Sequence, residues 1–307
     1  NMDEKLGRIS KYTNQYRPEI IEGLNVLVAS GVDPTKALDY MNVIGKTATA
    51  EQAAIIDTSK TAFSVSDNLK VPIDSLGKSM DILAQSGKEG RFELKDMASA
   101  FPSLTAGASM LGMKGVPAVA SLGAALQIAM KGAGDASEAA NNLENFIQKV
   151  TSPLAVKNFK DTFGINLKNV LVDAAKQGKD PILEVLEVMN KASKGDIFKV
   201  SEVFQDKQVL SFIKPMLQNL DEYKRIKATA LGASGIIDSD FTNMMTTTNE
   251  QWKQLRINMK ELVFPNLHAP LKALNDLLTK INSNPVMQKG LFTVVIGTIG
   301  AGDRKST

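Results

Sequence analysis

Cysteine is absent from the 307 residues, histidine occurs once, as His268, and aromatic residues make up only 6%. The absence of cysteine excludes disulfide frameworks, thiolate metal sites and cysteine nucleophiles, and it favours assembly in a reducing compartment. A zinc site or a serine–histidine triad would have to be built around His268 alone, and no motif surrounds that residue. We therefore expect no enzyme, no catalytic residue, no metal and no cofactor.

Long apolar runs are also scarce. The most apolar stretch, LFTVVIGTIGA at residues 291–301, has about half of the ~20 residues that a membrane-spanning helix requires. It is typical of a buried or terminal helix, or of a truncated spanning segment, so contact with a host membrane after Gly290 stays open. At the other end Asn1 precedes Met2 and the first 18 residues are polar, which favours a processed fragment with no cleavable signal.

The balance of charges gives no indication of a polyanionic partner. The formal net charge is +3, and basic residues are interleaved with acidic ones along the chain. Two basic groups could touch phosphates, but acidic residues flank both, as on an ordinary helix face; they are Lys224, Arg225 and Lys227, and Lys253, Arg256 and Lys260. Any contact with nucleic acid is therefore expected to be absent or non-specific.

Helix signals dominate what is present. Alanine, leucine, lysine and methionine are abundant, apolar residues recur with a period near 3.6, and strand-like alternation is nearly missing. Asp33-Pro34 and Asp180-Pro181 each place a capping side chain before a proline that suits the first helical turn. Glycines at helix-like stops include Gly31, Gly87, Gly112, Gly132, Gly164, Gly178 and Gly195. The sequence predicts an all-α, multi-helix bundle.

Residues 101–134 form a distinct segment that is rich in Ala, Gly, Ser, Leu and Met. Small side chains allow helix axes to approach closely, so the segment predicts two short helices that are broken at residues 112–117 and pack against each other or in the bundle centre. The alternative is a membrane-active hairpin, although Lys114 and Lys131 interrupt it. A membrane-active, pore-forming or toxin-like helical protein is accordingly the competing class of function.

Near the C-terminus the apolar spacing changes to a heptad pattern. Apolar residues advance by four and three residues in two runs that prolines separate, which is typical of a coiled-coil seam. We expect the two runs to form a helical hairpin within one chain or to pair with copies of the chain, and a substitution such as Leu274→Asp tests whether the seam is buried. The predicted contact residues are Phe241, Met245, Trp252, Leu255, Met259, Leu262, Leu267, Leu271, Leu274, Leu278 and Ile281.

Four segments follow from these changes in composition. We expect an N-terminal helical segment at residues 1–70 and a compact Ala/Gly-rich helical core at 71–217. A long helix with the heptad hairpin is expected at 218–284, and a truncated apolar segment at 285–307.

Two Gly-Lys-Ser/Thr triplets suggest a nucleotide phosphate loop but fail its spacing. The leading glycine, five residues before Gly45-Lys46-Thr47 and Gly77-Lys78-Ser79, is replaced by Tyr40 and Pro72, and no strand precedes either triplet. Helix ends explain both triplets better.

Six segments follow one another from about residue 50 to residue 282. They are TAFSVSDNLKVPIDSLGKSMDILAQSG, then FELKDMASAFPSLTAGASMLGMKGVPAVASLGAALQIAMKGAGDASEAANNLENFIQKVTSP with its paired Ala/Gly-rich helices, FGINL, DPILEVLEVM, KVSEVFQDKQVLSFIKPML and WKQLRINMKELVFPNLHAPLKALNDLL. In this order they resemble the core of phage tail tape measure proteins of the TP901 type. The resemblance covers about three quarters of the chain, and no single segment is diagnostic.

The resemblance implies a structural role in the virion. As a family member, the parent protein would form homo-oligomers, pack inside the tail tube, set tail length during assembly and leave ahead of the DNA. The implied partners are tail tube proteins, tail tip or baseplate proteins and tail assembly chaperones. The implied locations are the inside of the tail tube and, during assembly, the host cytoplasm.

Overall fold

The computed structural model describes residues 2–263, and its contacts divide the chain into two units, residues 1–254 and residues 255–307. The predicted boundaries at residues 70, 217 and 284 remain a prediction. The described residues form α-helices and two single 3-10 turns, and they contain no strand, which confirms the all-α class. The heptad hairpin is not confirmed, because residues 264–281 lie outside the described part.

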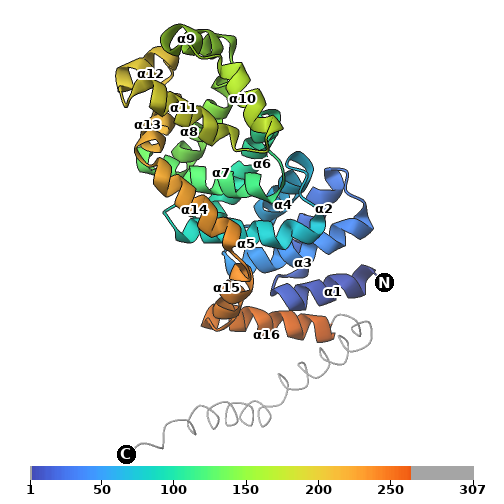
Figure 1. Cartoon of the computed structure of the whole chain (residues 1–307). Helices are drawn as coiled ribbons and strands as arrows, with labels where there is room; N and C mark the ends of the chain where they lie inside the picture. Colours follow the sequence, from blue (N-terminus) through green and yellow to red (C-terminus); the bar gives the residue numbers. More distant parts are fainter. Residues whose placement is uncertain (1, 264–307) are drawn as a thin grey trace, which may run out of the picture. The chain divides into compact units, whose positions relative to one another are not determined.

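Sixteen α-helices, α1 to α16, succeed one another along the described residues (Figure 1). The first eight, with the turns η1 and η2, are α1 (Met2–Thr13), α2 (Arg17–Ala29), α3 (Pro34–Ala50), α4 (Ile55–Asn68), η1 (Ile73–Ser75), α5 (Leu76–Lys88), α6 (Leu94–Met110), α7 (Gly115–Ala129), η2 (Met130–Gly132) and α8 (Ala136–Lys149). The remainder are α9 (Pro153–Phe163), α10 (Leu167–Lys176), α11 (Pro181–Ser193), α12 (Ile197–Val203), α13 (Lys207–Gln218), α14 (Leu220–Gly232), α15 (Ile236–Met245) and α16 (Thr248–Val263).

Helix starts follow the predicted caps. The Asp33 carboxylate accepts hydrogen bonds from backbone amides in the first turn of α3, and the Asp180 carboxylate does the same for α11. Most of the predicted glycine stops have a positive φ, as Gly164 does at +69°. The prediction is wrong for Gly87, which lies within α5, and for Gly132, which ends η2; neither has a positive φ.

Helix α7 is the centre of the first unit. Every side chain from Ala118 to Ala129 is buried, and α5, α8, α13 and α14 pack around the helix. A Cβ at Gly123 would lie 2.7 Å from Ser86 Oγ of α5, so the glycine permits the close approach of these two helices. The predicted break lies between α6 and α7, but α6 packs mainly against α4 and α8, so the two helices are not paired with each other.

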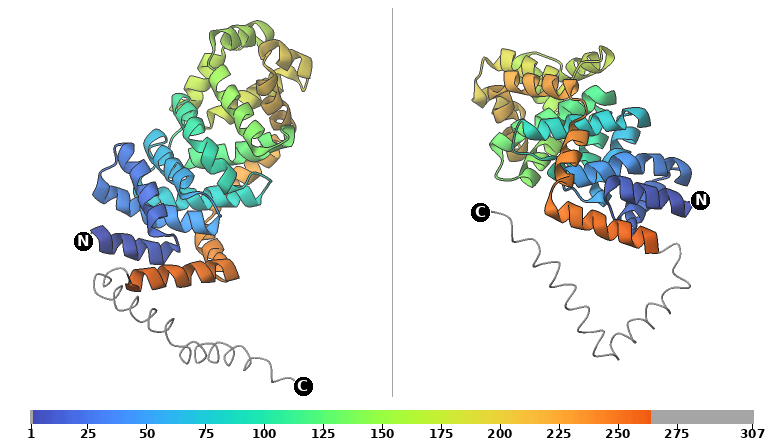
Figure 2. Two further views of the ribbon diagram at one scale, coloured as in Figure 1. Left: turned by 180° about the vertical axis from the view of Figure 1, so that it is seen from behind. Right: turned by 90° about the horizontal axis from the view of Figure 1, so that it is seen from below.

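Within the first unit, the late helix α15 packs against the early helix α3. Helices α1 to α4 lie at one end of this unit and α9 to α12 at the other, as both further views show (Figure 2). Helix α14 runs along α7 and α5 and leads to α15, which packs on α3 and α5. Segments about 190 residues apart in the sequence therefore lie side by side.

The predicted heptad seam does not lie on one helix. Helix α15 ends at Met245 and α16 begins at Thr248. Between them the hydroxyls of Thr246 and Thr247 donate hydrogen bonds of 2.7 and 2.8 Å to the carbonyl oxygens of Asn243 and Met244. Threonine side chains that bond to nearby carbonyls compete with the helical ladder, which accounts for the break.

Single helices in residues 2–263 do not reach the length and hydropathy of a membrane span. The segments Gly115–Gly132 and Ala136–Lys149 reach it only when taken together, and they are bent by 115° relative to each other.

Candidate partner-contact surface

Helix α16 carries an exposed apolar stripe. Trp252, Leu255 and Met259 lie three and four residues apart and therefore share one face of the helix. Their exposed fractions are 57%, 47% and 57%. Large apolar side chains that line up in the open are typical of a surface that binds another protein segment.

The other predicted contact residues lie elsewhere. Phe241, on α15, packs partly buried against the core, and Met245 ends that helix half-buried. The side chain of Leu262 and all of the predicted positions from Leu267 to Ile281 lie outside the described residues. The structure therefore brings three of the eleven predicted residues together on one exposed face.

Sequence reasoning missed Ile257, the one residue from 248 to 260 that is buried. It lies two residues from Leu255 and from Met259, hence on a different face from the stripe. The heptad spacing gave no signal for it. The only available sign was a β-branched apolar residue between the polar Arg256 and Asn258.

The first turns of α16 are held by polar contacts to the α1–α2 connection and to the start of α2. Asn14 Nδ2 donates a hydrogen bond of 2.8 Å to Glu250 Oε2. Lys253 Nζ lies 3.8 Å from the Glu19 carboxylate and 5.4 Å from the centre of the Tyr16 ring. These contacts leave the Trp252 side of the helix open.

A buried ionic network joins α7, α11 and α14. Asp180, whose side chain is 3% exposed, accepts hydrogen bonds from the Tyr223 hydroxyl and from Lys227 Nζ, the latter at 2.8 Å. Burial alone would raise the pKa of Asp180, but the Lys227 ammonium and the hydrogen bonds from Tyr223 and Ser121 lower it below the usual value. Burial, together with the Asp180 charge, raises the pKa of Tyr223 well above its usual value.

This network is suited to structure and not to proton transfer. Asp180 stays ionised and Tyr223 stays protonated near neutral pH, so neither group can exchange a proton there. The other Asp180 oxygen accepts from the amides of Ile182 and Leu183, which completes its role as a helix cap.

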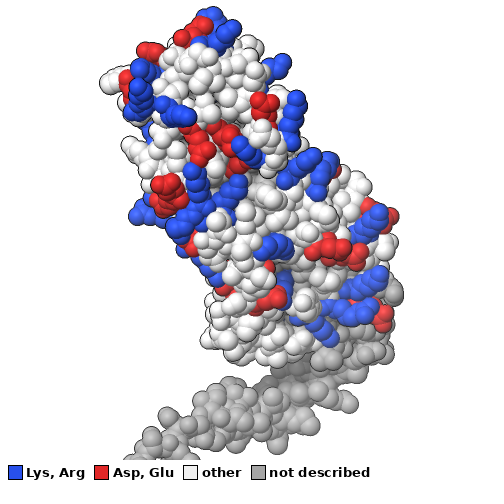
Figure 3. Space-filling model, viewed as in Figure 1, with Lys and Arg blue, Asp and Glu red and all other residues white. Residues whose placement is uncertain are grey.

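The basic group on α14 is paired with acidic residues from other parts of the chain. Lys224 pairs with Glu187 at 2.5 Å, Arg225 with Glu89 at 2.6 Å and Lys227 with Asp180. Blue and red side chains are accordingly interspersed over the visible face, with no continuous basic band (Figure 3). This arrangement gives no support to a phosphate-binding surface on α14.

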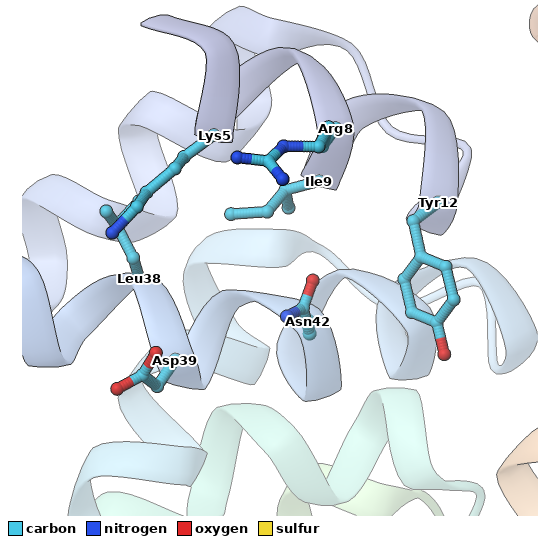
Figure 4. A pocket seen from close by; sticks show the side chains of 7 residues that line it. All are labelled: Lys5, Arg8, Ile9, Tyr12, Leu38, Asp39 and Asn42. Atoms are coloured by element: carbon cyan, nitrogen blue, oxygen red, sulfur yellow. The ribbon is translucent and has the colours of Figure 1, made fainter. Parts of the chain in front are cut away.

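A recess of about 430 Å³ lies between α1 and α3 (Figure 4). It is lined by Lys5, Arg8, Ile9 and Tyr12 from α1 and by Leu38, Asp39 and Asn42 from α3. In Figure 4 the guanidinium group of Arg8 extends over the cavity above Asn42, while Asp39 lies at its edge. Because the lining carries both signs of charge, it selects no single class of ligand.

The described part of the chain shows no arrangement for metal or nucleotide chemistry. Groups of three or more His, Asp or Glu side chains that could hold a metal ion do not occur in it. The two Gly-Lys-Ser/Thr triplets lie on α3 and α5; Gly45 is packed against Thr13, and Lys46 pairs with Asp238. Close helix packing and an ion pair thus account for the first triplet.

Comparison with known proteins gives two matches. A family model described as phage-related minor tail protein matches residues 4–204. A probable tape measure protein of Burkholderia phage BcepMu is 28% identical over 314 aligned positions, which cover 93% of this chain and 37% of the relative. The chain thus spans about a third of the length of this curated relative. No solved structure matches the chain.

Proposed function

The chain belongs to the phage-related minor tail protein family, and from that premise we propose that it is the compact helical module of a tape measure protein, which sets tail length during assembly. The observation that carries the proposal is the similarity of nearly the whole chain to a probable tape measure protein. Its resemblance to the TP901-type core, read from the order of its segments, supports the same function.

The proposed role is structural and not enzymatic. In the described residues the buried carboxylate of Asp180 serves as a helix cap and as the ion-pair partner of Lys227. The apolar residues form one core cluster that runs through the first unit. These features support a scaffold whose functional groups are surfaces for other proteins.

The proposed location is the inside of the tail tube, reached from the host cytoplasm during assembly. Several copies would pack together there, and the protein would leave ahead of the DNA. Tube subunits, tip or baseplate proteins and assembly chaperones are the proposed partners. Membrane contact is proposed only for the region after Gly290, which lies outside the described residues.

Within this role, the α16 stripe is the proposed contact surface. Trp252, Leu255 and Met259 would pack against a helix with matching spacing, either residues 267–281 of the same chain or a second copy. The competing function, a membrane-active or toxin-like protein, has less support, because α7, the most apolar described helix, is used as the buried centre of the fold.

The proposal is tested by the protein content of the virion. Quantitative mass spectrometry of purified phage should detect peptides of this chain in DNA-filled particles, and it should find them depleted in particles that have ejected their DNA. Major tube subunits, which stay in the tail, provide the internal control. Absence of the chain from filled particles would refute the structural role, and full retention in emptied ones would refute ejection.

A further inference from the structure

Helix α15 is attached to the first unit mainly by polar contacts. Ile237 is its one buried side chain, and Ile236 and Phe241 are only partly covered. The preceding helix, α14, buries Tyr223, Ile226 and Ala230 in the core. Since burial of apolar surface is the main source of stability for a packed helix, α15 is held more weakly than its neighbour.

Two side chains of α5, Asp81 and Lys78, hydrogen-bond to the backbone at the start of α15. The Asp81 carboxylate accepts hydrogen bonds of 2.8 Å from the backbone amides of Gly235 and Ile237, and so caps a helix other than its own. Lys78 Nζ donates to the carbonyl oxygen of Ala233. Gly235, with a φ of +69°, provides the turn between α14 and α15.

Two ion pairs hold the middle of α15. Lys46 of α3 pairs with Asp238, and its ammonium lies 5.4 Å from the centre of the Phe241 ring and 5.5 Å from that of Tyr12 on α1. Lys88 of α5 pairs with Asp240 at 2.7 Å. Each pair has at least one partly exposed member, so salt weakens both pairs.

A second carboxyl group faces Asp240. The Oε1 atom of Glu51, just after α3, is buried without a hydrogen-bond partner, and the neighbouring Asp240 charge disfavours ionisation of Glu51. The pKa of Glu51 is raised to about 7, mainly by burial and next by Asp240. Glu93 adds to this rise, and the positive charge of Lys88 opposes it. Above that pH two charged carboxylates meet at the contact and repel each other.

We propose that α15 is a releasable strap, which detaches from α3 and α5 as a unit while α7 and the helices around it stay folded, and which loosens as pH or salt concentration rises. Detachment pivots at Gly235, while Asn14 and Glu19 still hold the first turns of α16 through Glu250 and Lys253. It also uncovers Lys46, Asp81 and Lys88 on the face that α15 occupied. The inference concerns the conformations of the chain itself and does not depend on a role in the tail.

The direction in which pH changes the detachment of α15 follows from the raised pKa of Glu51. The pKa of Glu51 is about 7 when α15 is bound and returns toward its usual value of 4.5 when α15 is free. The bound state therefore takes up the extra proton, and detachment is favoured as that proton is lost. The opening equilibrium should rise with pH, by at most about tenfold per pH unit for this one proton, and level off above about pH 7.

Hydrogen exchange of backbone amides tests the strap. We expect protection factors, corrected for intrinsic exchange, to be at least about a hundredfold lower in α15 than in α7 at every pH, because α15 opens without global unfolding. They should fall with pH as stated, and by roughly fivefold between about 0.1 M and 1 M NaCl. Equal protection in α15 and α7, or α15 protection that is flat in both pH and salt, would overturn the inference.

A variant pair isolates the carboxyl contact. Glu51→Gln replaces the titrating group with an amide that can donate to Asp240 at any pH, so the fall of α15 protection between about pH 5 and pH 7 should disappear. Glu184→Gln, on α11 and far along the chain from α15, is the matched control and should keep the wild-type pH dependence. An unchanged pH dependence in Glu51→Gln would contradict the assignment, and the wild-type comparison with α7 needs neither variant.

Discussion

Asp180 is the residue on which the polar interior of the first unit depends most. Its carboxylate is buried, yet both oxygens have partners: two amides of α11, the Tyr223 hydroxyl and the Lys227 ammonium. A buried charge of this kind adds little net stability while it is fully paired. Loss of one partner is costly, because it leaves the charge uncompensated.

Lys227→Met should therefore destabilise the protein by about 3 kcal/mol, since the methionine keeps the length of the side chain but removes the ammonium beside Asp180. Urea unfolding followed by circular dichroism measures the change. Lys224→Met is the matched control on the same helix; its pair with Glu187 is largely exposed, so a loss of about 0.5 kcal/mol is expected. Equal losses in the two variants would contradict the buried network.

The cost of Lys227→Met should also depend on pH. In the wild type the pKa of Asp180 is lowered, so the stabilisation by the ion pair is present above the usual carboxyl value of 3.8 and is lost as the pH falls. The difference between wild type and variant should shrink in acid. A difference that grows in acid would show that Asp180 is not the partner.

Single residues also show where sequence reasoning stops. Asp180 was predicted as a cap because it precedes Pro181, and a cap is a local feature. Tyr223 and Lys227, 43 and 47 residues away, could not be predicted as its partners, since only the packing of α14 brings them there. The same holds for Glu51 and Asp240.

At the scale of helices, boundaries with a local chemical cause were predictable. The helix starts predicted from Asp-Pro pairs and most of the helix ends predicted at glycines agree with the structure. The small-residue segment contributes to two helices with a break between them, and the second, α7, lies at the bundle centre. Some failures have tertiary causes. This holds for Gly132, where a Cβ would lie 2.5 Å from the Ser211 carbonyl oxygen. The break in the heptad stretch has a local cause instead, because the hydroxyls of Thr246 and Thr247 bond to carbonyl oxygens three residues earlier.

The α16 stripe makes a prediction at this scale. If Leu255 packs against another heptad helix, Leu255→Asp should place a charge in that contact and lower the melting temperature or the oligomeric mass. Light scattering and thermal melts measure both quantities. Gln254→Asp, at an exposed neighbouring position, is the control and should change neither. A Leu255→Asp protein with wild-type mass and melting temperature would refute the contact.

At the scale of the whole molecule, the first unit is built as a folded body and not as an extended rod. Its helices are 7 to 17 residues long and pack on a common core. The all-α class was predicted from the apolar period and from the residues that start and end helices, and the family was predicted from the order of the segments. It could not predict which helices meet, such as α3 with α15, because such pairs depend on the path of the entire chain.

A folded body should not contribute to a molecular ruler in proportion to its residues. If the proposed tape measure function holds, tail length, measured by electron microscopy of phage with altered genes, tests this most directly. An insertion of about 30 residues that extends a continuous helix of the ruler should lengthen the tail by about 45 Å. The same insertion between Lys194 and Gly195, in the exposed turn between α11 and α12, should leave tail length unchanged. Equal lengthening by both insertions would contradict the compact module, and no lengthening by either would contradict the tape measure function.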